Sequence, residues 1–276
     1  MIPREMCAAA GAMLALMAPA PLFAATAVTT PMVQADASAA EQLDDKVLEL
    51  VDTYDDAYSA WRTDLMEKSK AFREAREDNP DAKFERPKPI EPDFWPKFDR
   101  FASAGSSRAQ GWCIKHYQPA EGASKDEQHA DFTRRVMAVL LDPNASLAEL
   151  PRTVFNSTRA RTLEKPTAEA LLVVIEQVAA DADVRSNAAY MRVAMNEVRG
   201  GDEAQKAKTL EGYRAVAAAY PDQKYGQRAG GKVFVAERLN IGQVAPDIVG
   251  ADVDGNPMKL SDFRGKVTVI DFWGFW

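Results

Sequence analysis

The sequence predicts a mainly α-helical protein in which a helical-hairpin domain is followed by a β-hairpin and one further strand. Residues 41–240 have the pattern of helices throughout, and along the first of them apolar residues recur at spacings near 3.6, the period of a helix with one buried face. Glycine and proline interrupt this pattern at points where helices are expected to end. After residue 240 the pattern changes to a tight-turn signal and a largely apolar run, which indicate strands.

Residues 1–27 have the pattern of an export signal. Arg4 precedes an apolar stretch from Ala8 to Phe23, and Ala25-Thr26-Ala27 forms a small-residue cleavage site. The stretch is shorter than the roughly 20 residues that span a bilayer, so we expect a cleaved signal and no integral membrane span in the mature chain. The mature protein would begin with a flexible stretch over 28–40 and would be located in the periplasm or cell envelope.

The helical domain is expected over residues 41–240, and its first helix over about 41–76. At 1.5 Å per residue such a helix would be about 54 Å long, which suits a coiled coil or a helix that crosses several partners. A proline-rich loop over 77–92 then interrupts it as a linker or surface loop. The apolar residues that repeat along this first helix are Leu43, Val47, Leu50, Tyr54, Tyr58, Trp61, Leu65 and Phe72.

Seven further helices are predicted over 94–103, 106–117, 125–141, 167–181, 184–199, 203–220 and 224–239. Tyr220-Pro221-Asp222 resembles the turn of tetratricopeptide-type hairpins, but no repeat of about 34 residues is found. The helical domain is therefore either a peptide-binding array or a bundle that positions the C-terminal segment. Asn144-Ala145-Ser146 and Asn156-Ser157-Thr158 are predicted to be surface turns.

Composition restricts the function. Lys and Arg number 34 against 41 for Asp and Glu, a net charge of −7, which argues against a nucleic-acid partner. Cys113 and His116 would share one face of a helix and could form a thiolate–imidazole pair or bind a metal, but Trp112 and Tyr117 beside them favour ordinary packing. We expect no metal site and no cofactor, because no metal-ligand motif occurs in the chain.

Residues 241–276 contain four short motifs in order. The run Gly242 to Asp247 reads G-x-x-A-P-D, Asp254-Gly255 is a tight-turn pair, and the run Leu260 to Lys266 reads L-S-D-x-x-G-K. A predicted buried strand from Val267 to Trp273 then leads into F-W-x-x-W, which ends at Trp276. These motifs resemble the opening of thioredoxin-like redoxin domains, especially the TlpA-like thiol-disulfide oxidoreductases.

This resemblance implies that residues 241–276 are the N-terminal β-hairpin and first central strand of an incomplete α/β thioredoxin-like domain. In the family, F-W-x-x-W leads into the catalytic Cys-x-x-Cys, which would place the nucleophile at the position after Trp276. Unpaired N–H groups at the start of the next helix would favour a thiolate there. Trp273 and Trp276 would lie near the nucleophile and Asp271 would be an acid–base neighbour, while no residue of the chain would itself be catalytic.

Three explanations for the absent cysteines are open: a fragment or frameshift, a UGA codon decoded as selenocysteine, or a chain that works without redox chemistry. The resemblance implies an exported oxidoreductase that exchanges disulfides or reduces peroxides, and the chain as given would be inactive. Its partners would be a disulfide-bearing protein or a peroxide, and a thiol-reducing protein. The alternative is a helical protein-binding module of the cell envelope with a vestigial redoxin segment.

Overall fold

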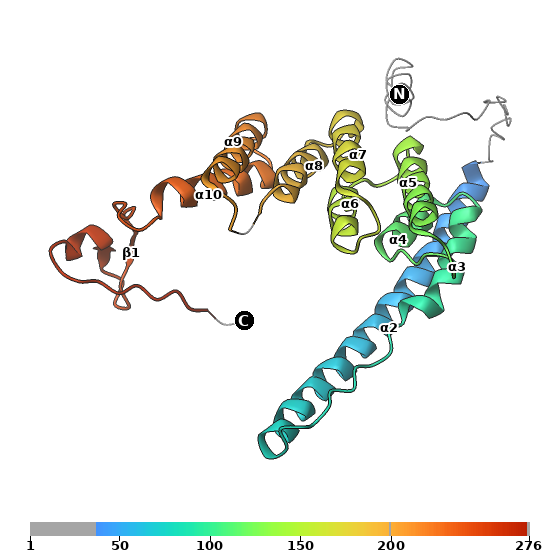
Figure 1. The fold of residues 1–276 in the computed structure, drawn as a ribbon, viewed down its shortest axis with the longest axis horizontal. Helices are drawn as coiled ribbons and strands as arrows, with labels where there is room; N and C mark the ends of the chain where they lie inside the picture. The colour runs from blue at the N-terminus through green and yellow to red at the C-terminus, as the bar shows by residue number, and fades with distance from the viewer. Residues whose placement is uncertain (1–36, 199, 275–276) are drawn as a thin grey trace. The chain divides into compact units, whose positions relative to one another are not determined.

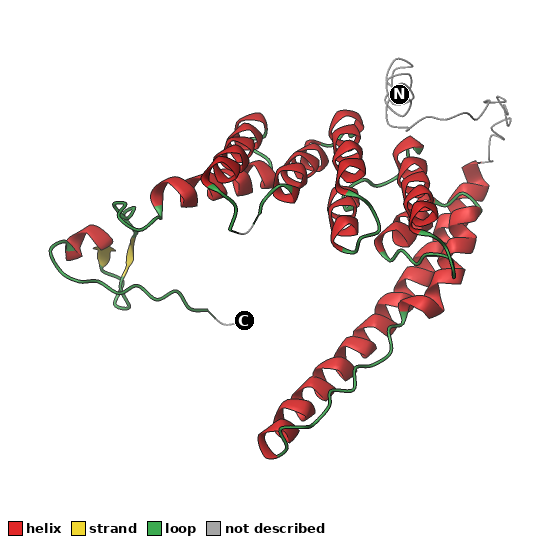
Figure 2. Cartoon of the chain, in the orientation of Figure 1, coloured by secondary structure: helices red, strands yellow, loops and turns green. Residues whose placement is uncertain are grey.

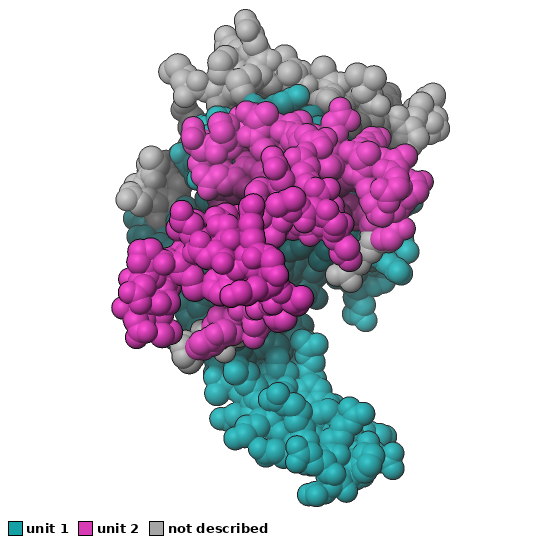
Figure 3. Space-filling model, turned by 90° about the vertical axis from the view of Figure 1, so that its left-hand side faces the viewer, with its two compact units in different colours: residues 1–196 teal, residues 197–276 magenta. Residues whose placement is uncertain are grey.

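The computed structural model describes residues 37–198 and 200–274, and the fold is mainly helical, as the sequence predicts (Figures 1 and 2). The predicted export signal over 1–27 and Trp276 lie outside the described residues. The chain divides into two compact units between Asn196 and Glu197 (Figure 3). The domain boundary that the sequence suggests at residue 240 therefore falls inside the second unit.

The first unit consists of helices joined by short connections. Ser124 begins helix α5 with a capping box, since its side chain accepts a hydrogen bond from the backbone N–H of Glu127 and the Glu127 carboxylate accepts one in return. Each helix of the unit packs against a neighbour in the chain. The helices are α2 (Ala37–Asp78), α3 (Glu91–Ser103), α4 (Ser107–Lys115), α5 (Lys125–Leu141), α6 (Leu150–Arg159), α7 (Lys165–Val178) and α8 (Ala182–Met195).

The long first helix is confirmed, and only part of it is buried. Val47 and Tyr54 are buried in a cluster with residues of α3 and α4. In that cluster the ring of Trp112 lies 3.9 Å from that of Phe98, nearly parallel, and 5.2 Å from that of Tyr54, nearly perpendicular. Aromatic pairs favour these offset and edge-on arrangements, so the cluster fixes α2, α3 and α4 against one another.

The proline-rich segment after α2 turns back and runs alongside the far half of the helix (Figure 1). The ring of Phe84 lies 5.5 Å from that of Phe72, and the guanidinium group of Arg86 lies 5.8 Å from the ring of Trp61. Pro87 is buried. The segment is therefore a surface loop that packs on α2 rather than a free linker.

Helix α6 is a correction to the sequence analysis, which predicts a surface turn at Asn156-Ser157-Thr158. These residues lie in the helix, Ser157 is buried, and its hydroxyl donates a hydrogen bond to the carbonyl of Val154 at 2.7 Å. Pro151 does not prevent the helix, because it occupies the first turn, where a backbone N–H has no partner within the helix. Asn144, by contrast, lies in an exposed turn as predicted.

The second unit begins with a helical hairpin formed by α9 (Glu203–Ala219) and α10 (Lys224–Arg238). Tyr213 and Val216 of α9 are buried in it, as is Ala229 of α10. The backbone of Tyr220 lies very close to Gly226 at the turn, since a Cβ atom placed on Gly226 would lie 1.7 Å from the carbonyl oxygen of Tyr220. Only glycine fits at this position.

The predicted β-hairpin is confirmed. Strand β1 (Val249–Ala251) pairs in antiparallel register with β2 (Pro257–Lys259), and Gly255 adopts a positive φ of 85° in the connecting turn. A short 3-10 helix, η1 (Leu260–Phe263), follows directly. Within the described residues this two-stranded sheet is the whole of the β structure (Figure 2).

The predicted central strand over residues 267–273 is not formed. This part of the chain is irregular, and Val267 and Val269 are 99% and 90% exposed. A central strand requires a hydrogen-bonded neighbour on each side, and no segment among the described residues pairs with this one. The run is apolar, as a buried strand would be, but an apolar composition does not provide partner strands.

Candidate functional site

Two aspartates hold the C-terminal hairpin in shape. The carboxylate of Asp252 accepts hydrogen bonds from the backbone N–H groups of Asp254 and Asn256 at 2.9 and 2.8 Å, which closes the turn. The carboxylate of Asp247 accepts two bonds from Ser261, one from its N–H and one from its hydroxyl, both at 2.8 Å. Hydrogen bonds to Asn256 and to Ser261 hold the pKa values of Asp252 and Asp247 below their usual range.

The bond between Asp247 and Ser261 joins two of the motifs that carry the redoxin resemblance. Asp247 ends G-x-x-A-P-D, and Ser261 belongs to L-S-D-x-x-G-K. The side chains around them are exposed, Val249 by 69% and Met258 by 42%, so apolar burial contributes little to this part of the structure. Polar side-chain contacts to the backbone therefore specify the hairpin.

Of the three residues predicted to surround a nucleophile, the structure describes two, Asp271 and Trp273. Asp271 and Trp273 lie on the irregular C-terminal segment, both side chains are exposed, and that of Trp273 is 74% exposed. Trp276, the third predicted neighbour, lies outside the described residues. The roles that the resemblance implies for these three residues stay predictions.

The Cys113–His116 pair is a packing element of the first unit. Cys113 is fully buried, and burial raises the pKa of its thiol to about 12. His116 stacks on Trp112 at 4.5 Å, and burial lowers its pKa to about 4. The hydroxyl of Tyr54 lies 3.5 Å from its Nδ1. A neutral thiol and a neutral imidazole do not form a nucleophilic ion pair, so the packing interpretation holds.

Metal coordination has no support among the described residues. In that part of the chain, no three histidine, cysteine, aspartate or glutamate side chains come together as a metal ion would require.

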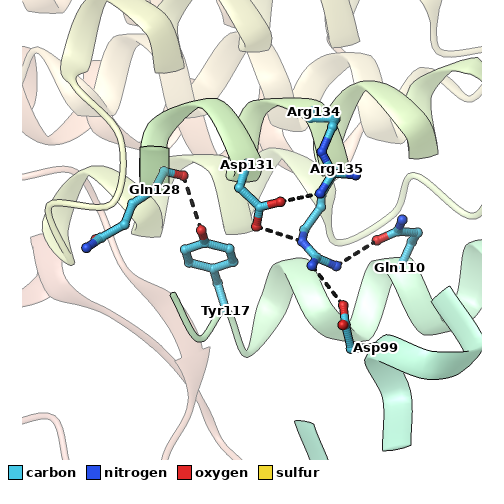
Figure 4. Close-up of polar contacts among 7 residues, drawn as sticks. All are labelled: Asp99, Gln110, Tyr117, Gln128, Asp131, Arg134 and Arg135. Atoms are coloured by element: carbon cyan, nitrogen blue, oxygen red, sulfur yellow. Dashed lines mark hydrogen bonds and ion pairs between the residues drawn. The ribbon is translucent and has the colours of Figure 1, made fainter. Parts of the chain in front are cut away.

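A charged network around Arg135 joins three helices (Figure 4). The guanidinium group lies 2.8 Å from the carboxylate of Asp99 on α3 and 2.9 Å from that of Asp131 on α5, and it contacts Gln110 on α4 at 3.4 Å. It also lies 5.3 Å from the ring of Trp95. Burial alone would raise the pKa of Asp131, but hydrogen bonds and the charge of Arg135 outweigh it and lower that pKa. Because its charged and polar groups contact one another, we assign this network a structural role.

The second unit has a cleft of about 580 Å³ between α9 and α10. Its polar groups are paired with one another, because Glu197 accepts hydrogen bonds from Lys232 at 3.0 Å and from the hydroxyl of Tyr213 at 2.9 Å. Glu203 and Lys206 form another ion pair at 2.8 Å. Few charged groups of this cleft remain available to a ligand.

The first unit has a cleft of about 420 Å³ along α6. Lys115, Glu149 and Arg152 line it, together with buried Phe132 and Ser157. The sequence does not predict α6, so Glu149 and Arg152 are not among the predicted site residues. The signal that could have revealed the helix is Leu150-Pro151 followed by Val154 and Ser157, a buried face that begins with proline in the first turn.

None of the helices in the described ranges combines the length and the apolar character that crossing a bilayer demands.

Comparison with known proteins finds short, partial similarities to members of the thioredoxin-like redoxin family. The chain is similar to thiol-disulfide oxidoreductase ResA of Bacillus thuringiensis subsp. konkukian, with 42% identity over 40 residues, 14% of this chain and 23% of that protein. ResA of Geobacillus kaustophilus is 47% identical over 36 residues, 13% of this chain and 21% of that protein.

These similarities are short, and the chain spans less than a quarter of the length of the curated relatives it matches. No family model matches the chain, and no solved structure does.

Proposed function

We propose that the complete protein is an exported thiol-disulfide oxidoreductase of the cell envelope, and that residues 241–276 begin its thioredoxin-like domain. The observation that carries the proposal is the similarity to ResA, whose aligned length of 36 to 40 residues is close to that of this segment. The contact between the motifs at Asp247 and Ser261 supports it, because it gives the motif order a structural basis.

The motif order assigns the catalytic residue to the position after Trp276, as cysteine or selenocysteine, within a Cys-x-x-Cys or its selenium counterpart. Its thiolate or selenolate attacks one sulfur of a substrate disulfide, which forms a mixed disulfide and releases the other sulfur as a thiolate. The second cysteine then attacks the mixed disulfide, which releases the reduced substrate and leaves an oxidised enzyme. A thiol-reducing partner returns the enzyme to its dithiol form.

With a peroxide as substrate, the same nucleophile attacks the O–O bond, gives a sulfenic or selenenic acid and releases water or an alcohol. The second cysteine condenses with this acid, loses water and gives the same intramolecular bond. Asp271 and Trp273 are proposed to lie beside the reacting atom once the segment has neighbouring strands. Cys113 takes no part in either reaction, because it is fully buried and its pKa is raised to about 12.

The experiment begins with the DNA beyond codon 276. The proposal expects an in-frame Cys-x-x-Cys, or a UGA followed in frame by two residues and a cysteine. The protein that includes this sequence should reduce insulin disulfides or hydrogen peroxide. Serine in place of the first cysteine or selenocysteine should abolish the activity, whereas the matched control Cys113→Ala should retain it. A folded extended protein that is inactive on both substrates contradicts the proposal.

The second candidate function is a protein-binding module of the cell envelope in which the C-terminal segment is vestigial. The observation that favours it is the cleft along α6, which the exposed cations Lys115 and Arg152 line. Unrelated sequence after codon 276, together with a partner that binds the helical units, would support this alternative over the oxidoreductase.

A further inference from the structure

The cleft along α6 has the form of a groove. Arg152 and Asn156 are four residues apart, so they lie on one face of α6, and Glu149 precedes the helix as its N-cap residue. The opposite wall comes from the end of α4 and from α5. We call this cleft the α6 groove and define it by Lys115, Phe132, Glu149, Arg152, Asn156 and Thr162.

The inner part of the groove is apolar. Ile114 and Phe132 are each only 1% exposed, and both line it. The ring of Tyr117 meets that of Phe132 edge-on at 5.2 Å, which fixes both rings in place. Because Ile114 and Phe132 are almost inaccessible, the apolar surface open to a ligand is the half-buried ring of Tyr117, which packing holds in place.

The rim of the groove carries two cations. Lys115 and Arg152 are both exposed, and neither forms an ion pair with any residue that the structure describes. Arg152 also lies in the first turn of α6, where the helix dipole adds positive potential and no acidic residue follows the cap. The single carboxylate of the groove, Glu149, leaves a net charge of about +1 in a protein whose net charge is −7.

The groove also carries hydrogen-bonding groups along its length. Asn156 and Thr162 line it, and no hydrogen bond to either side chain is formed within the described chain. The α6 face from residue 149 to residue 160 is about 16 Å long at 1.5 Å per residue. That length accommodates about five residues of extended peptide.

We propose that the α6 groove binds the carboxyl terminus of a peptide whose last side chain is apolar. A single carboxylate matches the net charge of the groove, and a guanidinium group binds carboxylates in a planar, two-point geometry. The last side chain of the peptide packs on the ring of Tyr117, and Asn156 and Thr162 bind the peptide backbone. The groove lies wholly in the first unit, so this inference does not depend on the proposed redox function.

The test uses the full chain and a fluorescent pentapeptide, Ala-Ala-Ala-Ala-Phe, with either a free carboxylate or an amide at its end. Fluorescence anisotropy should show that the carboxylate form binds at least about tenfold more tightly than the amide. Arg152→Gln and Lys115→Gln should each weaken the carboxylate form about tenfold. Glu149→Gln should strengthen it, because the substitution removes the one opposing charge.

Arg108→Gln is the matched control, since Arg108 is an exposed cation of α4 outside the groove and without an ion pair among the described residues. It should leave binding unchanged. Far-UV circular dichroism checks that every variant is folded. Equal binding of the amide, no binding by the folded chain, an equal loss in Arg108→Gln, or full displacement of the peptide by equimolar inorganic phosphate would each overturn the proposal.

Discussion

Replacement of Arg135 by methionine should destabilise the first unit by about 2 to 3 kcal/mol. The substitution keeps most of the side-chain volume but leaves the carboxylates of Asp99 and Asp131 without their cation. Breaking a fully buried pair costs about 3 to 5 kcal/mol, and breaking an exposed pair costs about 1 or less. The side chains of Asp99 and Asp131 are 36% and 31% exposed and that of Arg135 is 11% exposed, so an intermediate loss is expected.

Urea unfolding followed by far-UV circular dichroism measures this loss, with Lys68→Met as the control. Lys68 pairs with Asp64 at 3.0 Å, but both side chains are nearly half exposed, so its replacement should cost less than about 1 kcal/mol. In the wild type, Arg135 holds the pKa of Asp131 low, so the stabilisation is full above the pKa of this carboxyl in the unfolded chain and is lost as the pH falls through the lowered value. Equal losses of stability in the two variants would refute the conclusion that the Arg135 network stabilises the packing of α3, α4 and α5.

In the folded protein at pH 8, Cys113 should not react with a thiol reagent, because burial raises its pKa to about 12. In urea it should react fully. Fast labelling of the native chain would contradict this prediction. Between pH 6.5 and about 4, the unfolded chain binds a proton at His116 that the folded chain does not, so the free energy of unfolding should fall as the pH falls. His116→Phe should reduce this dependence of the free energy on pH, as measured by urea titrations. Gly226→Ala should lower the melting temperature, since its Cβ would lie 1.7 Å from the carbonyl oxygen of Tyr220. Gly231→Ala is the control, because no atom lies within 4 Å of its Cβ, and it should raise the stability by roughly 0.5 to 1 kcal/mol. Similar effects of the two substitutions would contradict the close approach of Tyr220 to Gly226.

The sequence alone predicts those helices whose ends are marked by nearby residues. Helix α5 has both of the ends that the sequence predicts, and the structure shows why its start is local, since Ser124 and Glu127 form a capping box there. Helix α6 was missed because Pro151 and the Asn156-Ser157-Thr158 run are typical of turns. Burial of Val154 and Ser157 against neighbouring helices overrides that local tendency, and such contacts are not visible in a linear pattern.

The C-terminal segment shows the same contrast between local and distant determinants. The turn at Asp254-Gly255 depends on neighbouring residues alone, since the carboxylate of Asp252 closes it and Gly255 supplies the positive φ. A strand over 267–273 depends on hydrogen bonds with segments far along a chain, so no property of these seven residues could secure it. The predicted neighbours of the nucleophile, Asp271 and Trp273, depend on that strand for their positions and therefore stay predictions.

The hairpin secured by Asp247 and Asp252 spans few residues, since its longest side-chain link joins positions 14 apart. Contacts of such short range close quickly, with little loss of chain entropy. During synthesis on the ribosome, this element can thus be in place before later residues emerge. In the thioredoxin-like domain that we propose, this hairpin would be the seed to which later strands are added.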